Sequence, residues 1–457
     1  MSLNLQYMTE NRHNDAFSSN FGMIAAAIGS AIGLGNLWRF PYLVGQYGGA
    51  AFIIVYLVIT LIISTPILLA ESVIGRRGGG SPAEAYSRVS GRKAWGGAGI
   101  MGMITCFMIM SFYVVVGGWT IKYMILSVAG QFHRGAVIDS PTMFEGFMTS
   151  TTAPIIYSWL FIALTIVIII LGVQKGIEKT SKLMMPMLFV LIILIGIRSV
   201  TLPGAKAGID YLFRPDFSSL NFGSLLAALG QSFFSLSLGA CMLITYGAYT
   251  PRTSNLVKNA AIISVSDTFF AVMAGCAIMP AVFAFGVNPT QGAGLVFVTL
   301  PQIFTQMPLG GLCSILFFFA LFLAAVSSAV SLFEVITSSI MSLGKKSRSN
   351  AALIVALVLV MTGSLCSLSQ GVLRGATIHG MNIFDQFDYV SANFLMTTGG
   401  LLTVLCVGWS MGKEQFVDEI TSGGTISISP ALASLLFFVI KYVAPIVIVA
   451  TAISIIL

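Results

Sequence analysis

The sequence places groups that could bind a cation in the middle of otherwise apolar segments. The apolar segment that begins near Gly22 is interrupted by Gly33-Leu34-Gly35, and Asn36 and Arg39 follow closely. A lipid bilayer offers no water to free backbone N–H and C=O groups, so unwound backbone at that depth is tolerated only where it is buried in protein or lines a polar cavity. The interruption therefore predicts a binding site.

A later apolar segment, 222–249, is interrupted in a similar way. Gly230-Gln231 opens it, and Ser235-Leu236-Ser237-Leu238-Gly239 puts hydroxyl groups and a glycine near its middle. Unwound carbonyls, hydroxyls, amides and carboxylates are the ligands that a hard cation such as sodium prefers. Interrupted segments at matching positions of two halves of a chain are typical of the binding site of secondary transporters.

Other polar side chains also lie within apolar segments. A carboxylate such as Asp267 is costly inside an apolar segment, and by default it marks a functional site. The alternative interpretation is a structural ion pair between this acid and a basic residue in the helix interior. Ser327 and Ser328 are adjacent hydroxyls; isolated serines in membrane helices usually bond to the preceding turn or to a neighbouring helix.

The composition assigns the chain to a membrane. Hydrophobic residues make up 56% of it and charged residues 9%, and the mean hydropathy is +0.94. Apolar runs of about 20 residues predict eleven crossings, approximately at 21–46, 51–75, 99–129, 153–172, 183–200, 222–249, 256–285, 309–343, 350–368, 384–411 and 430–457. The first is too long for a cleavable signal peptide and follows a polar leader.

We expect one transmembrane domain, 1–457, made of repeat one at about 20–200, repeat two at about 221–411 and an extra helix at about 430–457. Basic residues that flank the crossings place the N-terminus in the cytoplasm and the C-terminus outside, in the cell membrane. This topology explains the net charge of +7 without a nucleic-acid partner. The six cysteines all lie in predicted crossings, where packing is their expected role.

The motifs around the first interruption resemble those of the neurotransmitter:sodium symporters. The matching residues run from Gly29 to Tyr42 and from Gly48 to Phe52; further matches are Ser111-Phe112-Tyr113, Gly117-Gly118-Trp119, Gly230 to Gly239, Thr299-Leu300-Pro301 and Ser327-Ser328. The resemblance covers the chain from about residue 20, and eleven crossings resemble the shorter bacterial amino-acid transporters. It implies an all-α integral membrane protein with a 5+5 inverted repeat and discontinuous helices one and six, the leucine-transporter fold.

The resemblance also implies two sodium sites, and with it the adjacent serines are interpreted as ligands. The ligands implied for sodium 1 are the Ala31 carbonyl, Asn36, Ser235, Asp267 and the substrate carboxylate. The ligands implied for sodium 2 are the carbonyls of Gly29, Ile32 and Ala324 and the hydroxyls of Ser327 and Ser328. Many animal members need chloride beside the first sodium; Asp267 is expected to supply that negative charge and make transport chloride-independent.

The resemblance implies a substrate with its own carboxylate, since Gly33 stands where monoamine carriers place an aspartate. The Leu34 and Gly35 amides, Tyr113 and sodium would bind that carboxylate. The groups implied for the ammonium are the carbonyls of Ala31, Phe234 and Ser235 and the Ser237 hydroxyl. The side-chain pocket implied is Ile109, Val116, Phe234, Ala240, Ser328 and Leu332. The small Ala240 suggests space for a large apolar or aromatic side chain, although an alanine at a helix contact is more often close packing.

The gates are the last feature that the resemblance implies. Arg39 and Asp388 are similar to the external gate pair, with Gln231 holding the arginine and Tyr113 and Phe234 beneath it as a lid. The Arg-x-x-Trp motif that usually precedes the first crossing is absent. The acid that usually pairs with this arginine is also absent at the corresponding position, near Ser342 and Gly344. Phe17 or Asp15 is therefore expected to close the cytoplasmic side. Glu71 is similar to a buried acid that braces the broken helices.

Together these features predict a symporter of sodium and apolar or aromatic α-amino acids that works by alternating access in membrane lipid and is not an enzyme. A carrier of an ω-amino acid or an osmolyte with the same fold is the nearest alternative. An intramembrane hydrolase with Ser30 or Ser237 as nucleophile is a remote one, because no histidine or lysine lies at mid-span to act as base. A non-transporting sensor is a third.

Overall fold

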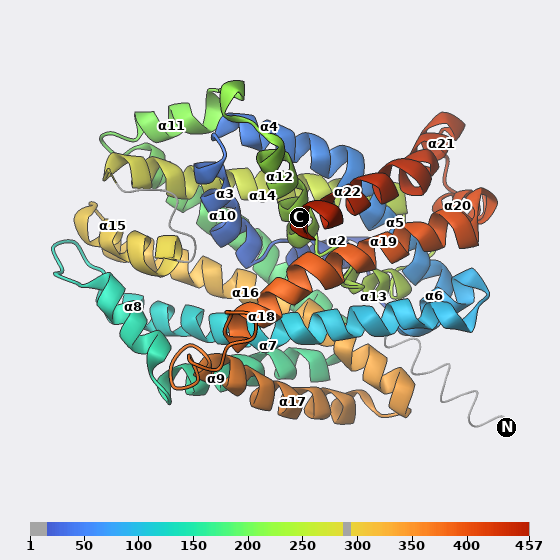
Figure 1. Ribbon diagram of the computed structural model, residues 1–457, viewed down its shortest axis with the longest axis horizontal. Coiled ribbons are helices and arrows are strands. Elements are labelled where there is room, and N and C mark those ends of the chain that lie inside the picture. Colours follow the sequence, from blue (N-terminus) through green and yellow to red (C-terminus); the bar gives the residue numbers. More distant parts are fainter. Residues whose placement is uncertain (1–15, 287–293, 457) are drawn as a thin grey trace.

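The computed structural model describes residues 16–286 and 294–456, and within them the protein is a bundle of helices (Figure 1). The described part contains only an isolated two-residue β-bridge, between Ile378 and Met381. The long helices run roughly parallel to the longest axis of the molecule (Figure 1). The predicted all-α class is confirmed.

The predicted crossings correspond to long apolar helices. In the described residues nine helices are long and apolar enough to cross a membrane, and a bent pair forms a tenth crossing. The nine are Ala50–Gly78, Lys93–Val128, Ala153–Ile170, Val173–Val200, Leu256–Ala284, Gly310–Gly344, Arg348–Leu368, Ile383–Met411 and Pro430–Ile453. Two short helices that make the broken sixth crossing bring the total to the predicted eleven.

The first crossing breaks where the sequence predicts. Helix α2 (Asn20–Ala31) begins with Ser19 as its N-cap, whose side chain accepts a hydrogen bond from the Gly22 amide. It ends at Ile32, which has extended backbone angles, and the chain continues as a π-helical turn and helix α3 (Phe40–Gln46). The two halves are bent by 48°. The helical hydrogen-bond pattern therefore ends inside the bundle: the Ile32 amide still donates to the Ile28 carbonyl oxygen, but the Gly33 amide donates to Asn36 Oδ1 at 3.2 Å.

The sixth crossing is broken more widely, between α12 (Phe222–Ser235) and α13 (Met242–Ala248). Three residues of the connection, Ser237, Gly239 and Cys241, have positive φ angles of 55°, 82° and 60°. Such angles are easy for glycine and costly for other residues. A Cβ on Gly239 would also lie 1.9 Å from the carbonyl oxygen of Met396, so only glycine fits there.

Glu71 supports this break from the second crossing. It lies on α5 (Thr65–Gly78), is fully buried, and its Oε1 accepts a 2.6 Å hydrogen bond from the Gly239 amide. A carboxylate thus satisfies a backbone donor that the interruption of the helix releases. The predicted bracing contact is present for the sixth crossing.

The two broken crossings lie among the longest helices of the bundle. Helices α7 (Gly96–Val128) and α16 (Gly310–Gly344) pack along each other. Helix α2 contacts α16, α10 (Lys179–Val200) and α14 (Leu256–Ala284), and α13 contacts α5. This arrangement surrounds both breaks with other helices and separates the released backbone from lipid.

Some expected boundaries were wrong. The fifth crossing begins at Val173, ten residues before the expected 183, because a π-helical stretch, Val173–Glu178, precedes α10 and carries the helix into the lysine-rich region. The polar segments 131–152, 201–221 and 412–429 each contain a short helix; the Asp139 side chain caps the first of these helices, and ion pairs of Asp418 and Glu419 hold the third. These helices are α8 (Ser140–Thr149), α11 (Lys206–Phe213) and α20 (Lys413–Ile420).

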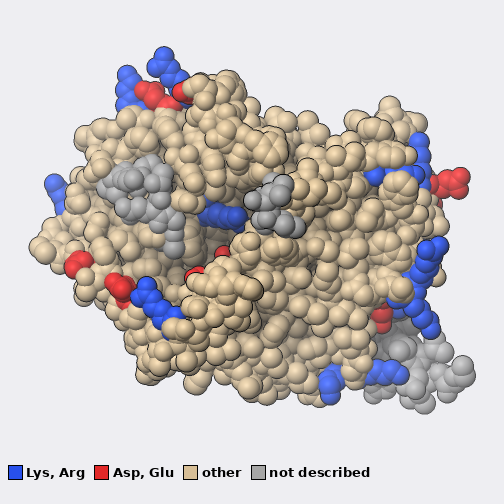
Figure 2. Space-filling view, in the orientation of Figure 1, with Lys and Arg blue, Asp and Glu red and all other residues tan. Residues whose placement is uncertain are grey.

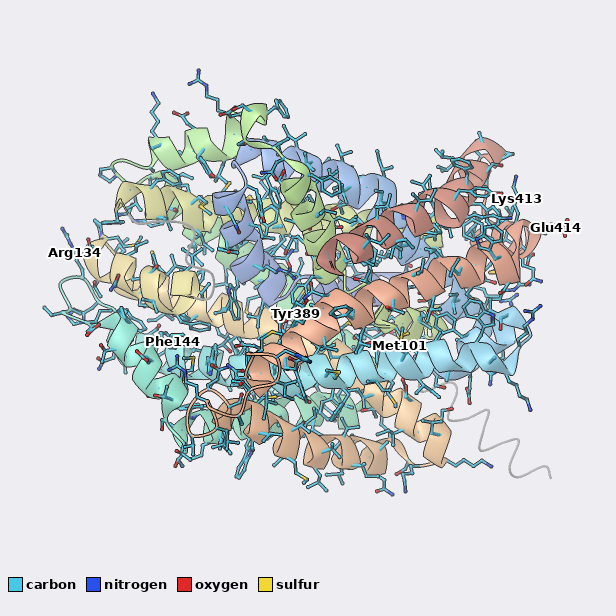
Figure 3. The ribbon with its side chains drawn as sticks, viewed as in Figure 1. Met101, Arg134, Phe144, Tyr389, Lys413 and Glu414 are labelled. Atoms are coloured by element: carbon cyan, nitrogen blue, oxygen red, sulfur yellow. The ribbon has the colours of Figure 1, made fainter. Side chains whose placement is uncertain are left out.

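Charged side chains gather at the two ends of the bundle, and the face between them is almost entirely uncharged (Figure 2). Lys413 and Glu414 lie at one end, beside α20, and Arg134 lies at the opposite end (Figure 3). A membrane-spanning bundle requires this distribution, because charges are costly in hydrocarbon.

We predict that Gly239→Ala destabilises the protein by about 1–3 kcal/mol or more, because the new methyl group would meet backbone at a positive φ. Gly230→Ala in the same crossing is the matched control; no atom lies within 4 Å of the added Cβ. The thermal-unfolding midpoint of the purified protein in detergent measures both. Equal midpoints for the two variants would contradict the assignment of Gly239 to an obligatory glycine position.

Candidate functional site

The residues released by both breaks line a cavity of about 40 Å³, here called the inner cavity. Its walls come from α2, α7, α12, α13, α16, the start of α19 (Met396–Leu405) and the two connections. The lining residues are Ser30, Ala31, Gly33, Leu34, Gly35, Ile109, Tyr113, Phe234, Ser235, Ser237, Met242, Ser328, Leu332 and Met396. All residues of the expected substrate site except Ala240 and Val116 are among them.

Ala240 lies outside this lining. It is fully buried, and its carbonyl oxygen accepts a hydrogen bond from the Cys106 thiol at 2.9 Å. Ala240 therefore does not border the space that was expected beside the substrate. The connection between α12 and α13 places it against α7 instead. Met242 and Met396 line the cavity instead. Sequence reasoning missed both, since a methionine in an apolar helix carries no signal of its own.

Gly33 allows the first crossing to approach its neighbours closely. A Cβ at this position would lie 2.4 Å from Ser328 Oγ and 3.4 Å from the Tyr113 hydroxyl. The position thus has no room for an aspartate side chain in this arrangement. No aspartate or glutamate is among the residues that line the inner cavity.

Asp267 is the centre of one cluster of oxygen and amide groups. It is fully buried on α14, and its carboxylate accepts hydrogen bonds from Asn36 Nδ2 at 2.8 Å, from Ser235 Oγ at 2.8 and 2.9 Å and from the Tyr56 hydroxyl at 3.2 Å. The expected sodium 1 side chains are therefore in contact. Tyr56 was not predicted.

The alternative role for Asp267, an ion pair in a helix interior, is not observed. No lysine or arginine in the described part of the chain forms an ion pair with it. All its partners are neutral donors from the first, second and sixth crossings. Because no basic side chain compensates this buried carboxylate, a bound cation could do so.

A second cluster of oxygens lies between α2 and α16. Ser327 Oγ is 3.0 Å from the Ala324 carbonyl oxygen and 3.4 Å from that of Ile32, and Ser328 Oγ is 3.4 Å from the Gly29 oxygen. Most of these separations exceed the 2.7–2.8 Å typical of hydroxyl hydrogen bonds. Oxygens held at ~2.4 Å around one cation stand roughly 3.4 Å apart at the edges of an octahedron. The donor set and its spacing fit a hard cation such as sodium.

A larger cavity of about 410 Å³, the outer cavity, adjoins the inner one. Leu34, Tyr113 and Phe234 line both cavities, so these side chains form the partition between them. Val116, expected in the side-chain pocket, lines the outer cavity only. Phe144, which lines it too, lies on α8 toward the end that carries Arg134 (Figure 3).

Arg39 and Asp388 both line the outer cavity but form no ion pair within 4.0 Å in the described structure. The Arg39 guanidinium instead lies 5.0 Å from the centre of the Phe234 ring. Gln231, expected to hold Arg39, donates to the Gly35 carbonyl oxygen at 3.1 Å. The expected gate contacts are thus not made in this conformation, in which the cavity between the partners is open.

The opposite end of the first crossing is closed by aromatic packing. Phe17 is buried, packs edge-on against Tyr246 and Tyr249, and its amide donates to the Tyr249 carbonyl oxygen at 3.1 Å. Asp15, the other residue expected there, lies outside the described residues. Phe17 is thus in position to close this end without the missing ionic pair.

Glu178, which sequence reasoning missed, anchors the same end. Its carboxylate accepts hydrogen bonds from the Ser18 amide and hydroxyl, both at 2.7 Å, and from the Ser19 hydroxyl at 2.8 Å. Lys182 lies 2.6 Å away. Carboxylates are favourable near a helix N-terminus, and this one ties the start of α2 to the start of the fifth crossing.

Comparisons with known proteins agree with this architecture. The model of the Sodium:neurotransmitter symporter family matches residues 14–139 and 143–457. An uncharacterized sodium-dependent transporter of Bacillus subtilis, YhdH, is 36% identical over 96% of the chain and 97% of its own length. One from Methanocaldococcus jannaschii is 34% identical over 89% of the chain and 84% of its own length. The crystal structure of MhsT in complex with L-phenylalanine is similar, with a TM-score of 0.88, 41% identity and coverage of 96% of this chain and 99% of that one.

Proposed function

Because this chain belongs to the Sodium:neurotransmitter symporter family, a family of membrane transporters and not of enzymes, we propose that it takes up apolar or aromatic α-amino acids together with sodium. The observation that carries the proposal is the inner cavity. Released backbone of both broken crossings faces an apolar wall there, and no carboxylate lines it. A zwitterionic amino acid matches such a site, since its carboxylate can bind backbone amides and its ammonium group can bind backbone carbonyls.

In the proposed complex the two ends of the zwitterion bind to different crossings. The Leu34 and Gly35 amides and the Tyr113 hydroxyl bind the carboxylate; Tyr113 is buried and lines the inner cavity together with Leu34 and Ser328. Carbonyls of Ala31 and Phe234 and the Ser237 hydroxyl bind the ammonium. The partners come from the first, third and sixth crossings, so substrate binding links these helices.

The side-chain end of the inner cavity favours an apolar substrate. Its walls include Ile109, Leu332, Met242 and Met396. The cavity has room for only a few water-sized molecules, so flexible walls must shift to admit an amino-acid side chain. Methionine is unbranched and adapts well to different shapes. The L-phenylalanine bound to MhsT supports a large apolar or aromatic substrate, and the apolar wall disfavours an ω-amino acid or osmolyte.

We propose two sodium ions per cycle, one at the Asp267 cluster and one at the Ser327–Ser328 cluster. A tenfold gradient contributes ~1.4 kcal/mol per ion, and a potential of ~100 mV adds ~2.3 kcal/mol per charge. Two ions thus supply about 7 kcal/mol, which corresponds to an amino-acid gradient of about 10⁵. Asp267 supplies the negative charge at the first site, so no chloride is needed.

The cycle proposed is alternating access across the cell membrane, with the N-terminus in the cytoplasm. Arg39 and Asp388 face each other across the outer cavity, and their approach would close it above Tyr113 and Phe234. Separation of Phe17 from Tyr246 and Tyr249 would open the other end. The bundle that carries the first and sixth crossings would rock against the rest of the domain.

Sodium-dependent counterflow in proteoliposomes tests the function. We expect vesicles loaded with unlabelled phenylalanine to accumulate labelled phenylalanine in sodium and not in potassium. A thermal-shift screen of the twenty amino acids in both salts ranks the substrates, because a ligand that binds only the folded protein raises its stability. The absence of counterflow for every amino acid that stabilises the protein would contradict the proposal and favour a sensor.

Replacement of chloride by gluconate should leave uptake unchanged. Asp267→Asn preserves the size of the side chain but removes its charge, so we expect sodium-dependent uptake to fall at least tenfold, about 1.4 kcal/mol or more. Asp210→Asn, on α11 outside the site, is the control. Uptake that disappears in gluconate, or an Asp267→Asn variant with normal sodium affinity, would refute the assigned role.

Met242→Ala and Met396→Ala should enlarge the inner cavity and shift preference from phenylalanine toward tryptophan about tenfold, since a few methylenes in an apolar pocket are worth roughly 1–3 kcal/mol. Met110→Ala is the matched control, because Met110 is buried on α7 but does not line the cavity. Competition of unlabelled amino acids against labelled phenylalanine gives the ratio. An equal shift in the control would indicate a general loss of packing.

A further inference from the structure

Lys441 is an unusual residue for its position, and it corrects the expectation that no lysine lies within the apolar crossings at mid-span. It lies in the last apolar helix, Pro430–Ile453, eleven residues or about 16 Å from the start of that helix. Within the described structure it forms no ion pair with a carboxylate. An ammonium group inside an apolar crossing is costly and by default indicates a functional site.

Three aromatic rings surround the ammonium group. The Nζ atom lies 4.9 Å from the ring centre of Trp409, 5.5 Å from that of Tyr442 and 5.9 Å from that of Phe437. Cation–π contacts stabilise the ammonium group, but the rings are neutral and leave its charge uncompensated. Trp409 is 63% exposed and Tyr442 45%, so the group opens toward the outside of the bundle. We call Lys441, Trp409 and Tyr442 the lysine cage.

The backbone around the lysine cage is distorted in both helices that form it. The π-helical stretch Cys406–Met411 (η8) packs against the π-helical stretch Val439–Val443 (η9). Gly408 makes this contact possible, because a Cβ there would lie 3.0 Å from Lys441 Cα. Such π-helical stretches are rare and often occur at functional sites.

The lysine cage lies toward the end of the bundle that carries α20. Trp409 is two residues from Met411, where the tenth crossing ends, and Lys413 of α20 lies at that end (Figure 3). Tryptophan and tyrosine concentrate at membrane–water interfaces. No acid of α20 forms an ion pair with Lys441 in the described structure; Asp418 pairs with Arg77 and Glu419 with Arg76.

We propose that the lysine cage binds the headgroup of an anionic phospholipid in the leaflet at this end of the bundle. The lipid phosphate would contact the Lys441 ammonium group, as basic pockets between membrane helices do. Ile446, Val449 and Ile453 are exposed apolar residues farther along the same helix and would contact the acyl chains. A free phosphate ion would not cover these exposed apolar residues, whereas a phospholipid would contact both them and the Lys441 ammonium group. The occupant that we propose is therefore a lipid. This site is independent of the substrate and sodium sites.

Native mass spectrometry of the purified full-length protein, released from nanodiscs of mixed phosphatidylglycerol and phosphatidylcholine, tests the proposal. We expect the wild-type protein to retain phosphatidylglycerol preferentially, and Lys441→Gln to reduce that retention at least fivefold. Lys441→Arg keeps the charge and should preserve it. Lys122→Gln is the matched control, because Lys122 also lies over two rings, those of Phe147 and Tyr157, but outside the lysine cage.

Trp409→Leu is a second variant that retains the charge and should weaken phosphatidylglycerol retention, so the test does not depend on the folding of Lys441→Gln. Unchanged retention in both cage variants would overturn the proposal, as would an equal loss in Lys122→Gln. Displacement of the lipid by millimolar inorganic phosphate would show that the site selects a free anion. No displacement by phosphate would support the lipid.

Discussion

The need to satisfy backbone polar groups away from water determines most of this structure. Each broken crossing releases amides and carbonyls inside an apolar bundle, where an unpaired group is costly. Glu71 satisfies the Gly239 amide, and Gln231 donates to the Gly35 carbonyl. The groups that remain face the inner cavity or the Ser327–Ser328 cluster. The binding functions proposed for the protein therefore use backbone groups that the two breaks expose inside the bundle.

The same contacts provide a physical link between ion binding and conformation. Partners of Asp267 come from the first, second and sixth crossings, whereas the Ser327–Ser328 cluster joins the first crossing to the eighth. An ion that binds where several crossings meet favours the arrangement in which they meet. The first crossing belongs to both clusters, and Phe17 and Glu178 hold its start at the opposite end. Movement of this one helix would thus affect both ions and the closed end together.

Sequence reasoning located the functional groups whose residue types are unusual in a membrane. Asn36, Asp267 and the paired serines are polar where hydrocarbon is expected, and the two glycine-containing breaks interrupt long apolar runs. The structure brings these residues together. Reasoning failed where a residue is ordinary for a membrane helix. Met242 and Met396 line the inner cavity although nothing in their types distinguishes them, and Ala240 is not among the lining residues, in a connection with three positive φ angles.

The sequence by itself determined the helical class, the eleven crossings and the positions of the breaks, because these depend on local hydrophobicity and on glycine, which are properties of short segments. Only the tertiary structure decided which side chains share a cavity, that Tyr56 joins the Asp267 cluster, and that Arg39 lies over Phe234 rather than beside Asp388. These contacts join residues up to several hundred positions apart, and the direction of a side chain in a non-helical turn depends on the helices that pack around it.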